Sequence, residues 1–66
     1  MEILLNGEKF QTNEGATVSD ILREKGTDPK TVIVETDGVI LKPEEFETTV
    51  LRDGSTVEVL RFVGGG

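Results

Sequence analysis

The chain contains no cysteine and no histidine, and its aromatic residues are three phenylalanines, without tryptophan or tyrosine. The lack of cysteine excludes disulfides and thiolate metal sites, and the lack of histidine removes the commonest general base. A domain of 66 residues buries only about 60% of the surface of its unfolded chain. We therefore expect an ordinary apolar core built from Val, Ile, Leu and Phe, without any covalent or metal staple.

Basic residues are also scarce, because 7 Lys and Arg stand against 13 Asp and Glu, for a net charge of −6. A surface this acidic argues against nucleic acid, which is bound by clusters of Lys and Arg. The charge suits docking onto basic or mixed-charge partners, and it equally suits a role in solubility alone.

Long hydrophobic runs are missing as well, since no run approaches the roughly 20 apolar residues that span a bilayer. Met1 is followed at once by strand-like sequence, so no signal peptide is expected. We expect a cytoplasmic protein without a membrane or nucleic-acid partner.

The first third of the chain predicts a β-hairpin. The apolar segment 2–5 ends at Asn6-Gly7, a strong signal for a tight hairpin turn, and residues 8–12 alternate around Phe10 as the returning strand.

A short helix is predicted to follow the hairpin. Thr17 is suited to cap it, and Asp20, three residues later, resembles the acid of a capping box, with Asp in place of the usual Glu. Gly26 is expected to end the helix, and Pro29 prevents its continuation. The apolar stripe at spacings of three and four residues comprises Val18, Ile21 and Leu22.

The second half of the chain contains β-rich segments separated by turn residues. Residues 32–34 form an unbroken apolar run, which predicts a strand covered on both faces. Phe46 is expected to anchor a turn or single helical turn in the core. The remaining expected elements are a strand at 39–41 after Asp37-Gly38, brief pairing at 49–51, and a long final strand at 56–63.

This order of elements predicts an α+β fold. A strand returning parallel after the helix requires a right-handed crossover, which places the helix across one face of the sheet. With the final strand beside the first, the arrangement is a ubiquitin-like β-grasp: a mixed sheet of four or five strands with one helix across one face. We expect a β-grasp domain at 1–63 and a flexible glycine tail at 64–66.

The tail carries the candidate chemistry, because Gly64, Gly65 and Gly66 end the sequence. The α-carboxylate of Gly66 is ionised at neutral pH, with an ordinary pKa of about 3.3–3.7, and needs activation to an acyl adenylate or similar ester. Without Cβ atoms, the glycines can thread a narrow channel towards a nucleotide in a partner. The alternative is a terminal linker without chemistry.

The final strand offers a candidate partner surface. Alternation gives it one face with Val57, Val59, Arg61 and Val63 and another with Glu58, Leu60 and Phe62. A single helix covers only one face, expected to be that of Val57 and Val59. Leu60 and Phe62 then either form an exposed partner site or lie beneath the 42–50 loop as a second small core.

The whole chain resembles the ThiS sulfur carriers of thiamine biosynthesis, which are related to MoaD. The residues that carry this resemblance are Asn6-Gly7, Thr17-Val18, Val32-Ile33-Val34-Glu35, Arg52-Asp53-Gly54, Val57-Glu58 and Phe62-Val63-Gly64-Gly65-Gly66. The resemblance implies that Gly66 is adenylated by an E1-like, ThiF-like enzyme using ATP and magnesium. Sulfur from a cysteine-desulfurase persulfide then replaces AMP, and the thiocarboxylate donates sulfur to a ThiG-like thiazole synthase. Such a chain is a protein co-substrate, binds no cofactor or metal itself, and is not an enzyme.

Three positions depart from the family pattern: Asp37 replaces the usual Asn, Pro43 stands about one place late, and Ser55 stands where an acid is common. These departures bear on the partner more than on carrier function. A MoaD-like carrier for molybdopterin and a carrier for tRNA thiolation therefore stay open as alternatives.

Two further classes of protein are compatible with the sequence. A stand-alone β-grasp interaction module would need no chemistry at Gly66. An enzyme with Glu44, Glu45 and Glu47 as paired carboxylates or a hard-metal site is less favoured than a solvated acidic turn, because no base, nucleophile or phosphate-binding loop accompanies them.

Overall fold

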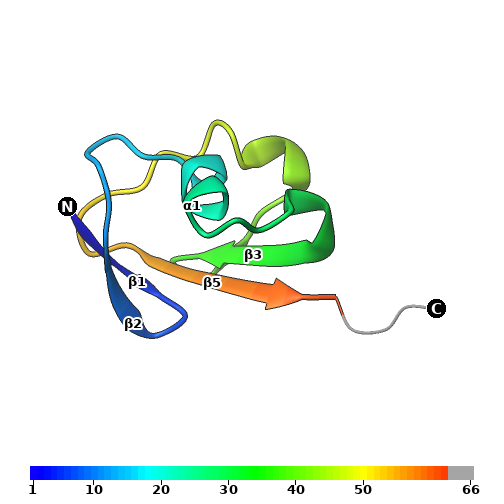
Figure 1. The fold of residues 1–66 in the computed structure, drawn as a ribbon, viewed down its shortest axis with the longest axis horizontal. Coiled ribbons are helices and arrows are strands. Elements are labelled where there is room, and N and C mark those ends of the chain that lie inside the picture. The colour runs from blue at the N-terminus through cyan, green and yellow to red at the C-terminus, as the bar shows by residue number, and fades with distance from the viewer. Residues whose placement is uncertain (63–66) are drawn as a thin grey trace.

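The computed structural model describes residues 1–62, and residues 63–66 lie outside the described part. It contains a five-stranded sheet with a single α-helix packed across one face (Figure 1). The elements are β1 (Glu2–Leu5), β2 (Glu8–Gln11), α1 (Val18–Glu24), a 3₁₀ turn η1 (Pro29–Thr31), β3 (Val32–Thr36), β4 (Val39–Ile40), a second 3₁₀ turn η2 (Pro43–Glu45) and β5 (Thr56–Arg61).

The sheet is mixed, with the strand order β2-β1-β5-β3-β4. The β1–β2 and β3–β4 pairs are antiparallel hairpins, and β5 lies between them, parallel to β1 and antiparallel to β3. The expected placement of the last strand beside the first is therefore confirmed. The expected parallel return after the helix is also confirmed: β2 and β3, the strands on either side of α1, run in the same direction, because β2 is antiparallel to β1, β1 is parallel to β5, and β3 is antiparallel to β5.

Two turn residues tie the hairpins to the central strand. Asn6 and Asp37 have φ angles of 51° and 47°, in the left-handed region that such turns require. The Asn6 side chain accepts a hydrogen bond from the Val59 N–H at 2.7 Å, and that of Asp37 accepts one from the Thr56 N–H at 2.9 Å. Both hairpin turns thus satisfy backbone donors of β5.

The helix begins and ends as its sequence predicts. The Thr17 N–H donates to the Asp20 carboxylate at 2.9 Å, and the Asp20 N–H donates to the Thr17 hydroxyl at 3.2 Å, which completes the capping box. At the other end Gly26 adopts a φ of 66°, and the Thr27 N–H donates to the Leu22 carbonyl at 2.8 Å. Within residues 1–62 no helix has the length and apolar character that crossing a membrane demands.

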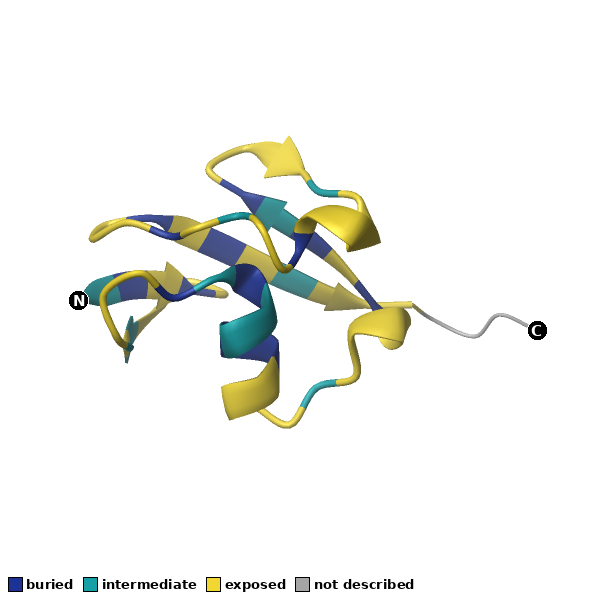
Figure 2. Ribbon diagram, turned by 90° about the horizontal axis from the view of Figure 1, so that it is seen from above, coloured by how far each residue is buried: buried dark blue, intermediate teal, exposed yellow. Residues whose placement is uncertain are grey.

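The core lies between α1 and the sheet face that the helix covers (Figure 2). Phe46 is only 2% exposed, so its expected role as the anchor of the 43–46 turn is confirmed. The fully buried side chains are Ile3, Val18, Ile21, Val34 and Val57.

The long segment before β5 closes the remaining side of this core. It is held to the helix start by an isolated bridge between Thr17 and Val50 and by a bond from the Leu51 N–H to the Ala16 carbonyl at 2.8 Å. The brief pairing expected at 49–51 is therefore confirmed. Ser55 is buried and its hydroxyl accepts from the Arg52 N–H at 3.0 Å, which gives this departure from the family pattern a local structural role.

The opposite face of the sheet is open. Ile33 is 39% exposed, so the prediction that residues 32–34 are covered on both faces is wrong. An unbroken apolar run is typical of a strand between two layers. Here the single helix covers only Val32 and Val34, and Ile33 points to the uncovered side.

Candidate functional site

The candidate tail begins at one end of the central strand. β5 ends at Arg61, and the Phe62 N–H donates to the Thr31 carbonyl at 3.0 Å, which fixes the last described residue against the start of β3. Gly64, Gly65 and Gly66, together with Val63, lie outside the described residues. Their expected roles stay predictions, and the structure describes only the body from which they follow.

An apolar strip crosses the open face beside this end of β5. Leu60 is 59% exposed and lies directly opposite Ile33 on β3. Val57 is buried on the helix side and Val59 packs partly against the core, so the predicted division of β5 into two faces is confirmed for these residues. Leu60 therefore belongs to an exposed surface and not to a second core.

Carboxylates flank the apolar strip. Glu35 and Glu58 lie opposite each other on neighbouring strands, and Glu35 also lies opposite the exposed Ile40 of β4. Like charges placed directly opposite are unfavourable in a sheet. A partner that presents apolar groups with a basic side chain would complement this face.

Phe62 has a mixed environment. It is 60% exposed, yet it also lines a shallow groove of about 390 Å³ with Pro29, Val32, Pro43 and Phe46. Phe62 was expected either to be exposed as a partner site or to lie beneath the 42–50 loop. Each alternative holds in part, since the loop lies beside Phe62 without covering it. Its exposed area remains available to a partner.

A second hollow lies beneath the C-terminal end of α1. It has a volume of about 150 Å³, with apolar walls from Leu5, Ile21 and Val59 and two cationic residues, Lys25 and Arg61, among those that line it. Because Arg61 is the last residue of β5, this hollow adjoins the end of the sheet from which the tail follows.

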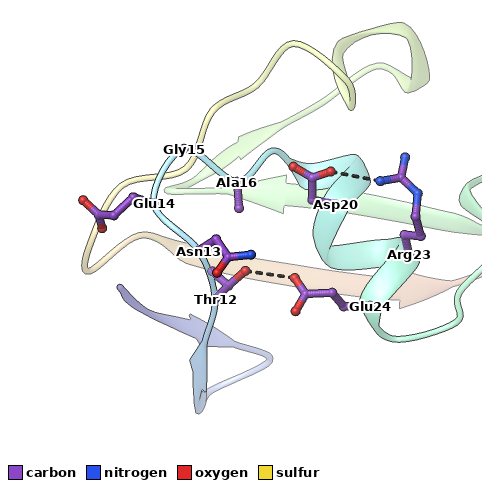
Figure 3. A pocket seen from close by; sticks show the side chains of 8 residues that line it. All are labelled: Thr12, Asn13, Glu14, Gly15, Ala16, Asp20, Arg23 and Glu24. Carbon is purple, nitrogen blue, oxygen red and sulfur yellow. Dashed lines mark hydrogen bonds and ion pairs between the residues drawn. The ribbon is translucent and has the colours of Figure 1, made fainter.

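A polar hollow of about 390 Å³ lies near the start of the helix, between α1 and the segment that precedes it (Figure 3). Its charged groups have local partners: Arg23 pairs with Asp20 at 3.0 Å, the Thr12 hydroxyl donates to Glu24 at 2.9 Å, and Glu14 lies 3.8 Å from the Met1 amino group. The pKa of Asp20 is lowered, first by the hydrogen bond from the Thr17 backbone and then by the Thr17 hydroxyl and Arg23. The contacts between Thr17 and Asp20 serve the helix start, and the bond from Thr12 ties Glu24, at the other end of α1, to the segment after β2.

The acidic turn is also built into local structure. The Glu45 carboxylate accepts from the Lys42 N–H at 2.8 Å and so caps η2, while Glu44 and Glu47 are exposed. Across residues 1–62 no three Asp or Glu side chains converge in the manner of a metal site. This geometry agrees with the solvated-turn interpretation of the three glutamates.

The fold and its exposed end define a class of protein. A mixed sheet with one helix across a single face is a β-grasp domain, and it matches a crystal structure of the thiamine biosynthesis protein ThiS from Geobacter metallireducens with a TM-score of 0.86, at 35% identity over the full length of both chains. The solution structure of a thiamine biosynthesis protein from the same organism matches with a TM-score of 0.80 and 33% identity, covering 100% of this chain and 88% of that one.

The family follows from the sequence comparison. The model of the ThiS family matches residues 2–66, and the chain belongs to that family. The sulfur carrier protein ThiS of Bacillus subtilis is 36% identical over 64 residues, which cover 94% of this chain and 96% of the relative.

Larger relatives match as well. Thiazole synthases from Paramagnetospirillum magneticum and Magnetococcus marinus are 32% and 33% identical over all 66 residues. The chain spans only 20% of the length of each of these relatives.

Sequence reasoning missed part of the exposed surface. It singled out Leu60 and Phe62 but not Ile33 or Ile40, which share the open side of the sheet with Leu60. A usable signal was present, because a sheet with one helix leaves one face uncovered along every strand.

Proposed function

We propose that this chain is a sulfur carrier protein of thiamine biosynthesis, acting in the cytoplasm as a protein co-substrate and not as a catalyst. The observation that carries the proposal is the match of the ThiS family model to residues 2–66, which extends to the last glycine. The proposal requires that Gly66 carries a free carboxylate in the mature protein.

The proposed chemistry takes place at Gly66. In the active site of a ThiF-like E1 enzyme, a carboxylate oxygen attacks the α-phosphorus of magnesium-bound ATP, and pyrophosphate leaves. The persulfide sulfur of a cysteine desulfurase then attacks the acyl carbon, AMP leaves, and a thiol reductant frees the thiocarboxylate. The acyl carbon of Gly66 suits this attack, because glycine has no side chain that could obstruct the incoming sulfur.

The downstream acceptor in this proposal is a ThiG-like thiazole synthase. Support comes from the two thiazole synthases whose sequences contain a region similar to this whole chain. Carriers for molybdopterin or tRNA thiolation share the same chemistry at the terminal glycine, so the acceptor must be tested separately from the carrier function.

Docking is proposed to use the open face of the sheet. Leu60 lies on this face opposite Ile33, and Phe62 is exposed at the end of the same strand, beside the groove that it lines with Val32 and Phe46. Ordering the glycine tail costs about 1–2 kcal/mol per residue. Burial of apolar side chains on the body, worth about 25 cal/mol per Å², offsets that cost.

Intact-mass measurement tests the proposal. The protein is incubated with the ThiF-like enzyme of its own organism, ATP, magnesium, a cysteine desulfurase and cysteine. The expected result is a mass increase equal to the exchange of one oxygen for sulfur, located on Gly66 by fragmentation. An unchanged mass in the complete mixture would contradict carrier function.

A matched variant separates carrier chemistry from simple binding. One alanine added after Gly66 leaves residues 1–62 unaltered but moves the carboxylate, and we expect it to abolish the mass change. If this variant still supports thiazole formation in a thiamine-requiring strain, the chain acts as a non-covalent interaction module instead.

A further inference from the structure

The hollow beneath the end of α1 combines apolar walls with two cations. Its volume of about 150 Å³ equals the space of roughly five water molecules in the liquid, which is enough for one aliphatic side chain. Leu5, Ile21 and Val59 provide the apolar contact, and the side chains of Lys25 and Arg61 are exposed beside them.

Neither cation has an acidic partner within the described residues. The ion pairs found across residues 1–62 join the Met1 amino group to Glu14 and Arg23 to Asp20. Lys25 instead lies 5.7 Å from the centre of the Phe10 ring. In a chain with a net charge of −6, the charged residues among those that line this hollow are both basic, Lys25 and Arg61.

The position of the hollow indicates what covers it. Arg61 is followed by only five residues to Gly66, and an extended chain advances at most about 3.6 Å per residue, so Gly66 reaches no further than about 18 Å from Arg61. A protein that takes Gly66 into a nucleotide site must therefore bring its own surface close to Arg61.

We propose that this hollow accepts a glutamate side chain projecting from the activating enzyme, a contact that rests on the carrier function proposed above. The methylene groups of the glutamate would lie against Leu5, Ile21 and Val59, and its carboxylate would meet Lys25 and Arg61. Arginine and lysine bound to a carboxylate in a partly dehydrated site form strong, charge-assisted hydrogen bonds.

The contact also fixes the orientation of the carrier on its partner. The open face presents Glu35 and Glu58 beside apolar groups, and the hollow presents cations, so the two surfaces call for opposite charges on the partner. Because the carrier has one acidic surface and one basic hollow, a complex in which it is rotated on its partner would bring like charges together and is disfavoured.

A charge reversal with a matched control tests the contact. Arg61→Glu replaces one of the two cations that are proposed to bind the partner's glutamate. Arg52→Glu makes the same change of charge at an exposed residue before the start of β5 and serves as the control. The measurement is ATP–pyrophosphate exchange by the organism's ThiF-like enzyme at increasing carrier concentration. We expect Arg61→Glu to raise the KM for the carrier by about tenfold with kcat little changed, and Arg52→Glu to change KM less than about twofold.

Salt dependence provides a second readout. The KM of the wild-type carrier should rise with ionic strength, and that of Arg61→Glu should rise less or fall, because salt screens attraction in one and repulsion in the other. Lys25→Glu should behave in the same way as Arg61→Glu. Thermal unfolding by circular dichroism verifies that each variant is folded, and a variant that is not folded is replaced by the glutamine substitution at the same position.

Several outcomes would overturn the inference. Unchanged KM in both Arg61→Glu and Lys25→Glu would exclude the contact. An equal rise of KM in Arg52→Glu would show that the effect is a long-range effect of net charge and not a contact at the hollow. Self-association abolished by Arg61→Glu would assign the hollow to a second copy of the chain. Failure of the wild-type chain itself to support exchange would instead refute the carrier function.

Discussion

At the scale of single residues, Asn6 and Asp37 have a role beyond their turns. Each starts a tight turn with a positive φ and also uses its side chain to satisfy an N–H of β5. Asparagine and aspartate tolerate this backbone region better than other residues with side chains. The same residue types therefore serve both turn geometry and pairing of the central strand.

Substitutions at Asn6 separate these two effects. Asn6→Gly keeps the favourable backbone but leaves the Val59 N–H without its side-chain acceptor, at a cost of about 1 kcal/mol of unfolding free energy. Asn6→Ala adds the left-handed strain, for a total loss of about 2 kcal/mol. Urea unfolding measures both, and an Asn6→Ala protein as stable as the wild type would contradict the assignment.

The sequence predicted the turns at these residues but not their bonds to β5. Asn-Gly and Asp-Gly pairs indicate tight turns from local chemistry alone. The bond from Val59 to Asn6 joins residues 53 positions apart, and it depends on the sheet register. No local pattern specifies that register.

At the scale of elements, α1 depends on its capping box and on packing. Its seven residues are too few to form a stable helix in water without tertiary contacts. Thr17 and Asp20 satisfy donors at its start, and Val18, Ile21 and Leu22 attach it to the sheet. The sequence predicted this element fully, because both caps and the apolar stripe are encoded within ten residues.

The capping box predicts a dependence of stability on pH. The pKa of Asp20 is lowered from its ordinary value of 3.8 by hydrogen bonds to the charged carboxylate. A lowered pKa gives stability that is complete above the unfolded value and is lost as pH falls through the folded value. Asp20→Asn should therefore be less stable than the wild type at neutral pH, and the difference should shrink below 3.8.

Denaturant unfolding from about pH 7 to about pH 2 measures this convergence. Glu44→Gln removes an exposed carboxylate of the acidic turn and serves as the control for general charge effects. Curves for Asp20→Asn and wild type that remain parallel down to the lowest pH would count against the assigned role of the carboxylate.

At this scale the direction of the strand after the helix was predicted, but its neighbours were not. β3 runs parallel to β2, the strand before the helix, and its hydrogen-bonded neighbours in the sheet are the antiparallel strands β5 and β4. The long connection from 41 to 55, which contains η2 and the bridge of Val50 to Thr17, allows β5 to enter between the hairpins. Strand propensity identifies such strands but carries no information about their order.

At the scale of the whole molecule, one face of the sheet supports the core and the other is free for a partner. A pair of substitutions tests this division. Phe46→Ala empties a buried site and should cost about 3–5 kcal/mol, enough to unfold much of so small a domain. Leu60→Ala should change stability by less than about 1 kcal/mol, because its side chain is largely exposed.

Binding should show the reverse effect for Leu60. We expect Leu60→Ala to weaken association with the ThiF-like enzyme about tenfold or more, as measured by titration calorimetry at constant salt. Unaltered affinity would exclude Leu60 from the docking surface. The candidate surface was predictable from strand alternation, whereas the cationic hollow was not, since it joins the end of α1 to the end of β5.

The central position of β5 has a consequence for how the protein is made. The ribosome releases the two hairpins first, and in the sheet neither touches the other except through Thr56–Arg61. A nascent chain halted before Thr56 consequently has two hairpins that no strand joins into one sheet, although the 49–51 segment can still contact the start of α1. The strand that leads to the proposed reactive glycine is thus also the last one needed to complete the sheet, so a truncated product would lack both its central strand and its working end.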